Sequence, residues 1–373
     1  MLQKLIALCA AFLLAAPIAG DRSPLLREIR LKNTVHEMSL REKVSQLFIV
    51  RPESLSPGRQ GLGATSLTDS MAAILSEYPA GGVIQFAANI TDPVQITSFN
   101  RALSDALDVP PFIAVDEEGG SVSRLANEKN FDLPVYESAA AVGKSGRKDD
   151  ALAMGRAIGG YLSEYGFDLD FAPVADVFTN PANTVIGRRA FSTDAAVVRD
   201  MTGAFADGLR ENGIISCFKH FPGHGDTAED SHVGLAVNAK TKEELMNCEW
   251  LPYKGLPDDV FVMIGHIALP AVVGDSTPAT LSKQVVTDIL RGELGFEGLI
   301  VTDSMEMGAI VNTYGANEAA VMAFEAGCDV ILCPVDYLGA VHAIESAVAD
   351  GRIPEERLDE SVMRILKVKD FFP

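Results

Sequence analysis

The stretch from residue 213 to residue 232 reads GIISCFKHFPGHGDTAEDSH. Its first six residues form a continuous apolar run, which is typical of a buried parallel β-strand. The polar, glycine-rich segment that follows holds three of the six histidines in the chain. Because α/β folds place their active sites just beyond the carboxyl ends of parallel strands, this stretch predicts a strand that leads into an active-site loop.

Short apolar runs of this kind recur along the chain, and stretches with helical spacing separate them. Strands that alternate with helices predict a parallel sheet with helices outside it. Eight such strands predict the α/β class and a (β/α)8 TIM-type barrel, with a doubly wound open sheet as the alternative. The candidate strands are Gln46–Val50, Gly82–Phe86, Phe112–Val115, Asp168–Phe171, Ile214–Phe218, Val260–Ile264, Leu299–Thr302 and Val330–Leu332. The candidate helices are Pro93–Leu107, Asp149–Tyr165, Ala195–Asn212, Ser282–Leu294, Ala316–Ala326, Tyr337–Asp350 and Glu355–Phe372.

Length and composition limit the classes of protein to consider. A chain of 373 residues with 47% hydrophobic residues can bury a full core. No low-complexity linker interrupts it, so we expect one barrel domain over residues 21–373. The net charge of −20 argues against nucleic acid and anionic membranes as partners. We expect a monomer whose four cysteines after residue 20 are free thiols.

The first 20 residues have the pattern of a secretory signal peptide. Lys4 precedes an apolar run from Leu5 to Ala16, and small residues follow up to Gly20. We therefore expect the protein to be exported, either to the periplasm or out of the cell, without a stable membrane partner. An uncleaved membrane anchor is the alternative.

Polar residues collect at the carboxyl ends of the candidate strands, where a barrel brings them to one pocket. They are Asp116, Asp176, Lys219, His220, His266 and Asp303. Asp303 ends a buried run and is followed by Gly308, so it is suited to act as a nucleophile. Capping of the next helix is its alternative role.

Asp230 and His232 are two residues apart in the polar segment that follows the apolar run 213–218. Such a spacing lets the carboxylate accept a hydrogen bond from the imidazole, which makes an oriented general acid/base. The alternative is a metal site built from His220, His224, His232 and nearby acids, although the spacing lacks the regularity of common zinc sites.

Several segments resemble the motifs of β-N-acetylglucosaminidases in glycoside hydrolase family 3. The central one is KHFPGHG-(x4)-DSH over residues 219–232, and the resemblance extends from about residue 36 to the C-terminus. The other segments that resemble the family are MSLREKVSQLF (38–48), VDEEGGSVSR (115–124), GFDLDFAPVADV (166–177), TVIGRRAF (184–191) and TDSMEMGA (302–309).

This resemblance implies an exo-acting, retaining enzyme that removes terminal β-linked N-acetylglucosamine. Asp303 would be the nucleophile, and His232, oriented by Asp230, the acid/base. The residues that would hold the sugar hydroxyls are Asp116, Arg124, Arg189, Lys219 and His220. No cofactor and no metal are implied. A phosphorylase and an inactive sugar-binding homologue are the competing functions, and muropeptides, chitin oligosaccharides and glycan termini are all open as substrates.

Overall fold

The computed structural model describes residues 24–56, 63–227 and 234–371. The chain forms two compact units, Met1–Met38 and Ser39–Pro373. The first unit contains the helix α2 (Pro24–Glu37). In the described ranges, no helix combines the length and the apolar character needed to cross a membrane.

Eight parallel strands form the sheet of the second unit, as the apolar runs predict. Their order follows the chain from β12 and β1 through to β11, and a parallel bridge between Val301 and Val330 closes the sheet between its two end strands. The barrel is therefore confirmed and the doubly wound alternative is wrong, because an open sheet leaves both end strands unpaired. The strands are β1 (Phe48–Val50), β2 (Gly82–Gln85), β3 (Phe112–Val115), β6 (Leu169–Asp170), β7 (Ile215–Phe221), β9 (Phe261–Ile264), β11 (Leu299–Thr302) and β12 (Ile331–Leu332).

Strand β7 is longer than the sequence indicates. Lys219 and His220 were expected after the strand, but they lie within it. Lys219 pairs with Val174, and Phe221 pairs with Ile264 of the next strand. The backbone pairing therefore continues past the end of the apolar run, because the polar side chains of Lys219 and His220 form hydrogen bonds and ion pairs inside the protein.

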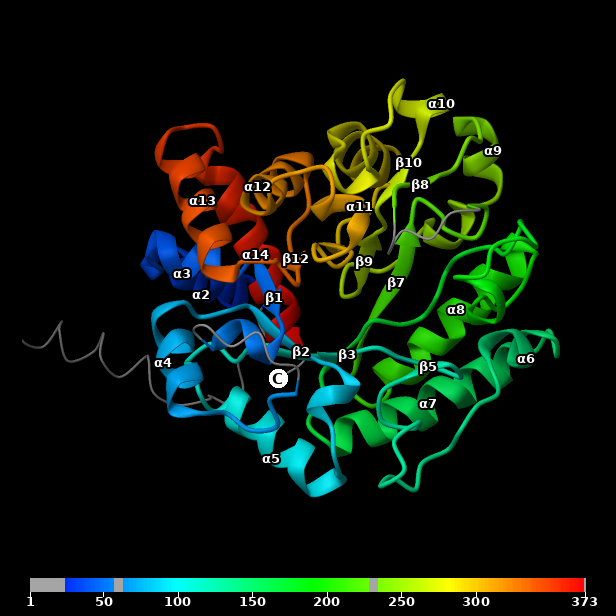
Figure 1. Ribbon diagram of the computed structural model, residues 1–373, viewed down its shortest axis with the longest axis horizontal. Helices are drawn as coiled ribbons and strands as arrows, with labels where there is room; N and C mark the ends of the chain where they lie inside the picture. Colours follow the sequence, from blue (N-terminus) through cyan, green and yellow to red (C-terminus); the bar gives the residue numbers. More distant parts are fainter. Residues whose placement is uncertain (1–23, 57–62, 228–233, 372–373) are drawn as a thin grey trace, which may run out of the picture. The chain divides into compact units, whose positions relative to one another are not determined.

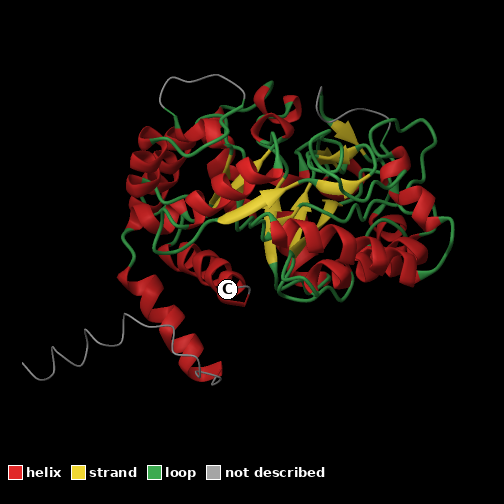
Figure 2. Cartoon of the chain, turned by 90° about the horizontal axis from the view of Figure 1, so that it is seen from below, coloured by secondary structure: helices red, strands yellow, loops and turns green. Residues whose placement is uncertain are grey.

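Helices surround the barrel and connect its strands (Figure 1). Figure 2 shows the strands at the centre of this unit with helices around them. The α-helices are α3 (Leu40–Ser45), α4 (Asp69–Glu77), α5 (Pro93–Ser104), α6 (Ala139–Gly143), α7 (Lys148–Glu164), α8 (Ala195–Arg210), α9 (Lys242–Asn247), α10 (Pro270–Val273), α11 (Gly308–Val311), α12 (Ala316–Ala326), α13 (Tyr337–Ala349) and α14 (Glu355–Phe371). The 3₁₀ turns are η1 (Pro52–Leu55), η2 (Ala87–Asn89), η3 (Gly187–Arg189), η4 (Leu251–Tyr253) and η5 (Ala279–Leu281). The two small sheets pair β4 (Glu117–Gly119) with β5 (Val122–Ser123) and β8 (Ala236–Val237) with β10 (Ile267–Ala268).

All seven predicted helices are present within a few residues of their expected ends. One differs in type, since η6 (Gln284–Glu293) is a π-helix. Helix α8 begins where the sequence predicts, because the Asp194 carboxylate accepts hydrogen bonds from the amides of Ala196 and Val197.

Helices α7 and α8 pack closely because small residues face each other. A Cβ on Gly155 would lie 2.1 Å from the carbonyl oxygen of Phe205, and a Cβ on Gly208 would lie 2.5 Å from that of Leu152. Only glycine permits this approach. Helix α8 also packs against β7, the strand that carries Lys219 and His220.

The closing helix α14 contributes a lysine to the amino-terminal end of the barrel. Lys369 Nζ lies 2.9 Å from Gln46 Oε1 and 5.0 Å from the centre of the Phe112 ring. Asp168, next to β6, accepts a hydrogen bond from the amide of Ile113 in β3. This end of the barrel therefore holds two ionisable groups, Lys369 and Asp168, opposite the end where the strands' polar residues converge.

Candidate active site

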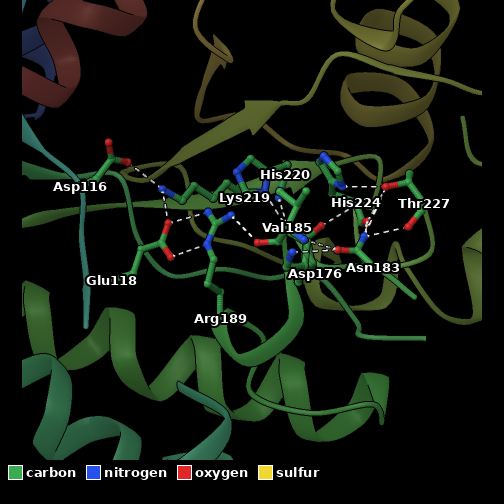
Figure 3. A network of polar contacts seen from close by, with 12 residues as sticks. Asp116, Glu118, Asp176, Asn183, Val185, Arg189, Lys219, His220, His224 and Thr227 are labelled. Carbon is green, nitrogen blue, oxygen red and sulfur yellow. Dashed lines mark hydrogen bonds and ion pairs between the residues drawn. The ribbon is translucent and has the colours of Figure 1, made fainter. Parts of the chain in front are cut away.

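A chain of alternating charges connects β3, β4, β7 and η3 (Figure 3). Lys219 Nζ lies 2.7 Å from Asp116 Oδ1 and 2.7 Å from Glu118 Oε1. The guanidinium of Arg189 donates two hydrogen bonds of 2.8 Å to the Glu118 carboxylate and a third to the carbonyl of Val185. Two cations and two carboxylates, from β4, β7, η3 and the position directly after β3, are therefore fixed in one place.

The electrostatics of this network keep its members charged. Burial by itself would raise the pKa of Glu118, but Arg189 and Lys219 more than offset it and hold that pKa well below its usual range. Burial by itself would lower the pKa of Lys219, but Asp116 and Glu118 raise it above its ordinary value. The ammonium group is therefore a permanent hydrogen-bond donor at neutral pH.

Arg124 joins the network from the turn that follows β5. Its Nη2 lies 3.4 Å from Asp116 Oδ2. The buried carboxylate of Glu117 accepts hydrogen bonds from the amides of Arg124, Leu125 and Ala126, at 2.5 to 3.0 Å. Glu117 therefore acts on the backbone, fixing the turn that presents Arg124.

The buried Asp176 orients two histidines. Its Oδ2 lies 2.8 Å from His220 Nδ1, and its Oδ1 accepts a 2.6 Å hydrogen bond from the amide of His224. Burial would raise the pKa of Asp176, but His220 and His224 lower it below the ordinary value, so the group is ionised. An ionised carboxylate only accepts hydrogen bonds, so His220 Nδ1 carries a proton and Nε2 is left for a ligand.

Asn183 fixes the backbone of the histidine-rich loop. Its side-chain nitrogen donates to the carbonyls of His224 and Thr227, at 2.7 and 2.9 Å. Thr227 Oγ1 lies 2.8 Å from His224 Nδ1. His224 is buried, and burial lowers its pKa, which favours the neutral imidazole.

Asp303 follows β11 and lies at the carboxyl end of the barrel. Its amide donates to the carbonyl of Ile264, and its Oδ1 accepts a 2.8 Å hydrogen bond from the amide of Ser304. It does not cap the next helix, since Met307 occupies the N-cap position of α11. The helix-capping role is therefore wrong. The Asp303 carboxylate is held instead by the backbone of the turn that follows it.

One cavity of about 430 Å³ lies among these elements. This volume lies in the range of small-molecule sites. Its lining includes the six described residues to which the family resemblance gives a catalytic or sugar-binding role: Asp116, Arg124, Arg189, Lys219, His220 and Asp303. Asp176, which its strand end also predicts for the pocket, is not among the lining residues and reaches the cavity only through His220 and His224. Asp230 and His232 lie outside the described residues, so their roles stay predictions.

Some cavity residues have no predicted role. Glu118 stands two residues after Asp116 in the same motif, and this position is the signal that could identify it. Arg51 and Phe86 directly follow β1 and β2, so their positions at strand ends are a comparable signal. The Arg51 guanidinium lies 4.8 Å from the centre of the Phe86 ring and donates to Glu306 at 3.0 Å. They line the same cavity as Arg124, whose guanidinium lies 5.9 Å from the centre of the Phe86 ring.

His266 departs from its predicted place. It was expected in the pocket, but it is fully buried and is not among the residues that line the cavity. Its ring bonds instead to Thr280 and to the backbone of Ser304.

The metal alternative is tested only in part. Among the ranges 24–56, 63–227 and 234–371, no group of three or more His, Cys, Asp or Glu side chains is placed to hold a metal ion. His232, which this alternative also needs, lies outside those ranges. His220 and His224 both bond to Asp176 or to the loop around it.

A closed parallel barrel with a polar cavity at the carboxyl ends of its strands defines a TIM-type fold with its site in the usual place. The sequence model described as "Glycosyl hydrolase family 3 N terminal domain" matches residues 39–368. The chain therefore belongs to glycoside hydrolase family 3.

Several proteins that are similar to this chain are β-hexosaminidases. Beta-hexosaminidase A of Pseudoalteromonas piscicida is 33% identical over 83% of this chain and 56% of its own length. Beta-hexosaminidase LpqI of Mycobacterium tuberculosis is 33% identical over 89% of this chain and 83% of its own. The structure of a family 3 β-N-acetylglucosaminidase from Paenibacillus sp. str. FPU-7 is similar with a TM-score of 0.81 at 37% identity, over 89% of this chain and 62% of that one. This chain thus spans little more than half the length of beta-hexosaminidase A.

Proposed function

We propose that this protein is an exo-acting, retaining β-N-acetylglucosaminidase, that is, a β-hexosaminidase. The observation that carries the proposal is the convergence of Asp303 and the network of Lys219, Glu118 and Arg189 on one cavity of about 430 Å³. A nucleophilic carboxylate beside fixed hydroxyl-binding charges suits attack on a bound sugar. The β-hexosaminidase relatives support the choice of an N-acetylated sugar.

The proposed chemistry has two displacements. Asp303 attacks the anomeric carbon, the glycosidic bond breaks, and His232 gives its proton to the departing oxygen. His232 then takes a proton from water, the hydroxide attacks the same carbon, and the bond to Asp303 breaks. Two inversions retain the configuration. A histidine with a pKa of about 6.5 needs little adjustment for this work.

The substrate and the location are also proposals. The N-terminal sequence pattern supports export, so we propose substrates outside the cytoplasm, with peptidoglycan fragments ahead of chitin oligosaccharides. We expect purified protein to release N-acetylglucosamine from a muropeptide faster than from chitobiose. A preference for chitobiose would contradict the peptidoglycan assignment and leave the hexosaminidase assignment intact.

The sharpest test compares two aryl glycosides that differ only at C2. A site built around the acetamide leaves buried polar groups without partners when glucose binds, so the aryl β-N-acetylglucosaminide should have the higher kcat/KM. Equal rates on the aryl β-glucoside would refute the hexosaminidase assignment. Release of the sugar 1-phosphate in phosphate buffer, rather than free sugar, would identify a phosphorylase.

A further inference from the structure

His266 is a buried residue at a strand end that the proposed chemistry does not use. It follows β9 and Gly265, and its imidazole connects two elements that are distant in sequence. Nδ1 lies 2.8 Å from Thr280 Oγ1 in η5, and Nε2 lies 3.0 Å from the carbonyl oxygen of Ser304. Ser304 is the residue directly after Asp303.

The partners of the ring determine which nitrogen carries a proton. The carbonyl of Ser304 can only accept, so Nε2 is protonated and donates. The hydroxyl of Thr280 also lies 3.2 Å from the carbonyl oxygens of Ile264 and Gly265. The Thr280 hydroxyl can donate to Nδ1 when the His266 ring is neutral. When the ring is charged, the hydroxyl can donate to one of these two carbonyls instead. In both states the bond from His266 to Ser304 persists.

Ser304 in turn controls the carboxylate of Asp303. Its amide donates to Asp303 Oδ1 at 2.8 Å, and its carbonyl also accepts a hydrogen bond from the amide of Met307. The amide of Asp303 donates to the carbonyl of Ile264, which Thr280 Oγ1 contacts too. A closed circuit of hydrogen bonds therefore runs from Ile264 through Thr280, His266 and Ser304 to Asp303.

We propose that His266 is a positioning residue for the nucleophile: by holding the Ser304 carbonyl, it fixes the turn that aims the Asp303 carboxylate. The proposal rests on the proposed function, since it presumes that Asp303 attacks the sugar. A nucleophile held in attack geometry reacts faster without binding its substrate more tightly, so the effect belongs to the chemical step.

Covalent trapping with a 5-fluoro-N-acetylglucosaminyl fluoride isolates this step. An oxygen of Asp303 bonds to the anomeric carbon, and fluoride leaves with the electron pair of its bond. The time course gives a first-order trapping rate and a separate dissociation constant for the sugar. Peptide mapping of the labelled wild type establishes whether Asp303 carries the sugar.

We expect His266→Gln to lower the trapping rate about tenfold or more while the dissociation constant changes little. Thr280→Val should lower the trapping rate less than His266→Gln does, because valine keeps the shape of threonine but removes the hydroxyl that contacts His266 Nδ1. Thr280→Ser should restore the wild-type rate. The control is His342→Gln, because His342 is an exposed histidine on α13 whose Nε2 contacts the Tyr78 hydroxyl and which does not line the cavity.

Three outcomes would overturn the proposal. The first is a trapping rate in folded His266→Gln equal to that of the wild type. If His266→Gln fails to fold, an unchanged rate in Thr280→Val is equally decisive. The second is a loss that lies entirely in the dissociation constant, which would mean a role in sugar binding. The third is a wild-type enzyme labelled elsewhere than Asp303, and only this outcome also removes the proposed nucleophile.

Discussion

Glu118 binds Arg189 through two parallel hydrogen bonds of 2.8 Å, inside the cavity and away from water. The neighbouring Arg188 pairs with Glu137, but both of those side chains are mostly exposed. Two consecutive arginines therefore have similar partners in opposite surroundings. Buried, bidentate pairs fix geometry, whereas exposed pairs contribute little.

This contrast predicts the effect of Glu118→Gln. The amide removes one negative charge beside Lys219 and Arg189, so the pKa of Lys219 should fall. We expect kcat/KM to decrease about 10- to 100-fold, because a neutral amide replaces the charged partner of Arg189 and Lys219. Initial rates on an aryl N-acetylglucosaminide measure this effect. Glu137→Gln should behave as the wild type, and a wild-type kcat/KM in Glu118→Gln would contradict the role of Glu118.

Asp303→Asn should abolish turnover while the protein stays folded, because an amide cannot form the glycosyl ester. Activity on an aryl glycoside and a thermal unfolding curve measure the two properties separately. The matched control is Asp336→Asn, since Asp336 follows β12 but caps α13 by accepting from the amide of Gly339. Asparagine caps a helix about as well as aspartate does, so Asp336→Asn should leave both stability and turnover nearly unchanged. Near-normal activity in Asp303→Asn would exclude it as the nucleophile.

His232→Ala should slow substrates with poor leaving groups far more than activated aryl glycosides, because a good leaving group needs little protonation. Asp230→Ala should give a milder form of the same pattern, since it would only orient the imidazole. Rates on a series of aryl glycosides with different leaving-group pKa values test both variants. Equal losses across the series would indicate a binding role instead.

Activity should survive EDTA, because side chains fill every role in the proposed chemistry. The measurement is turnover before and after chelation, followed by addition of zinc. Loss on chelation with recovery on zinc would favour the metal alternative and would make His220, His224 and His232 ligands.

Lys369 predicts a pH dependence of stability at the other end of the barrel. Withdrawal from water lowers its pKa to about 7, against the opposing effect of Asp168. The unfolded chain keeps this proton up to about pH 10.5, whereas the folded protein releases it near pH 7. Stability should therefore rise with pH between these values, by at most about 1.4 kcal/mol per pH unit.

Lys369→Met should remove this rise. Urea unfolding of the variant and the wild type at pH 7, 8 and 9 measures it as a widening difference in the free energy of unfolding. Lys367→Met, an exposed position on the same helix, is the control and should follow the wild type. A constant difference between Lys369→Met and the wild type would show that Lys369 does not titrate in this range.

The sequence by itself determined the barrel and most of the cavity. Eight apolar runs separated by amphipathic stretches leave few arrangements that bury every strand, and parallel strands bring their carboxyl ends together. For that reason the positions of Asp116, Lys219 and Asp303 at strand ends are enough to predict that they converge. The motif resemblance added Arg124 and Arg189, which no strand end indicates.

The tertiary structure alone decided how these groups are held. Glu118 and Asp116 are two residues apart and look alike in the sequence, but Glu118 binds both Arg189 and Lys219, from η3 and β7. His266 follows a strand as Asp303 does, yet its ring bonds to the carbonyl of Ser304 in the turn after Asp303. A strand end determines which edge of the barrel a residue reaches. The direction and charge of its side chain depend on partners distant in the chain, and only packing brings those partners close.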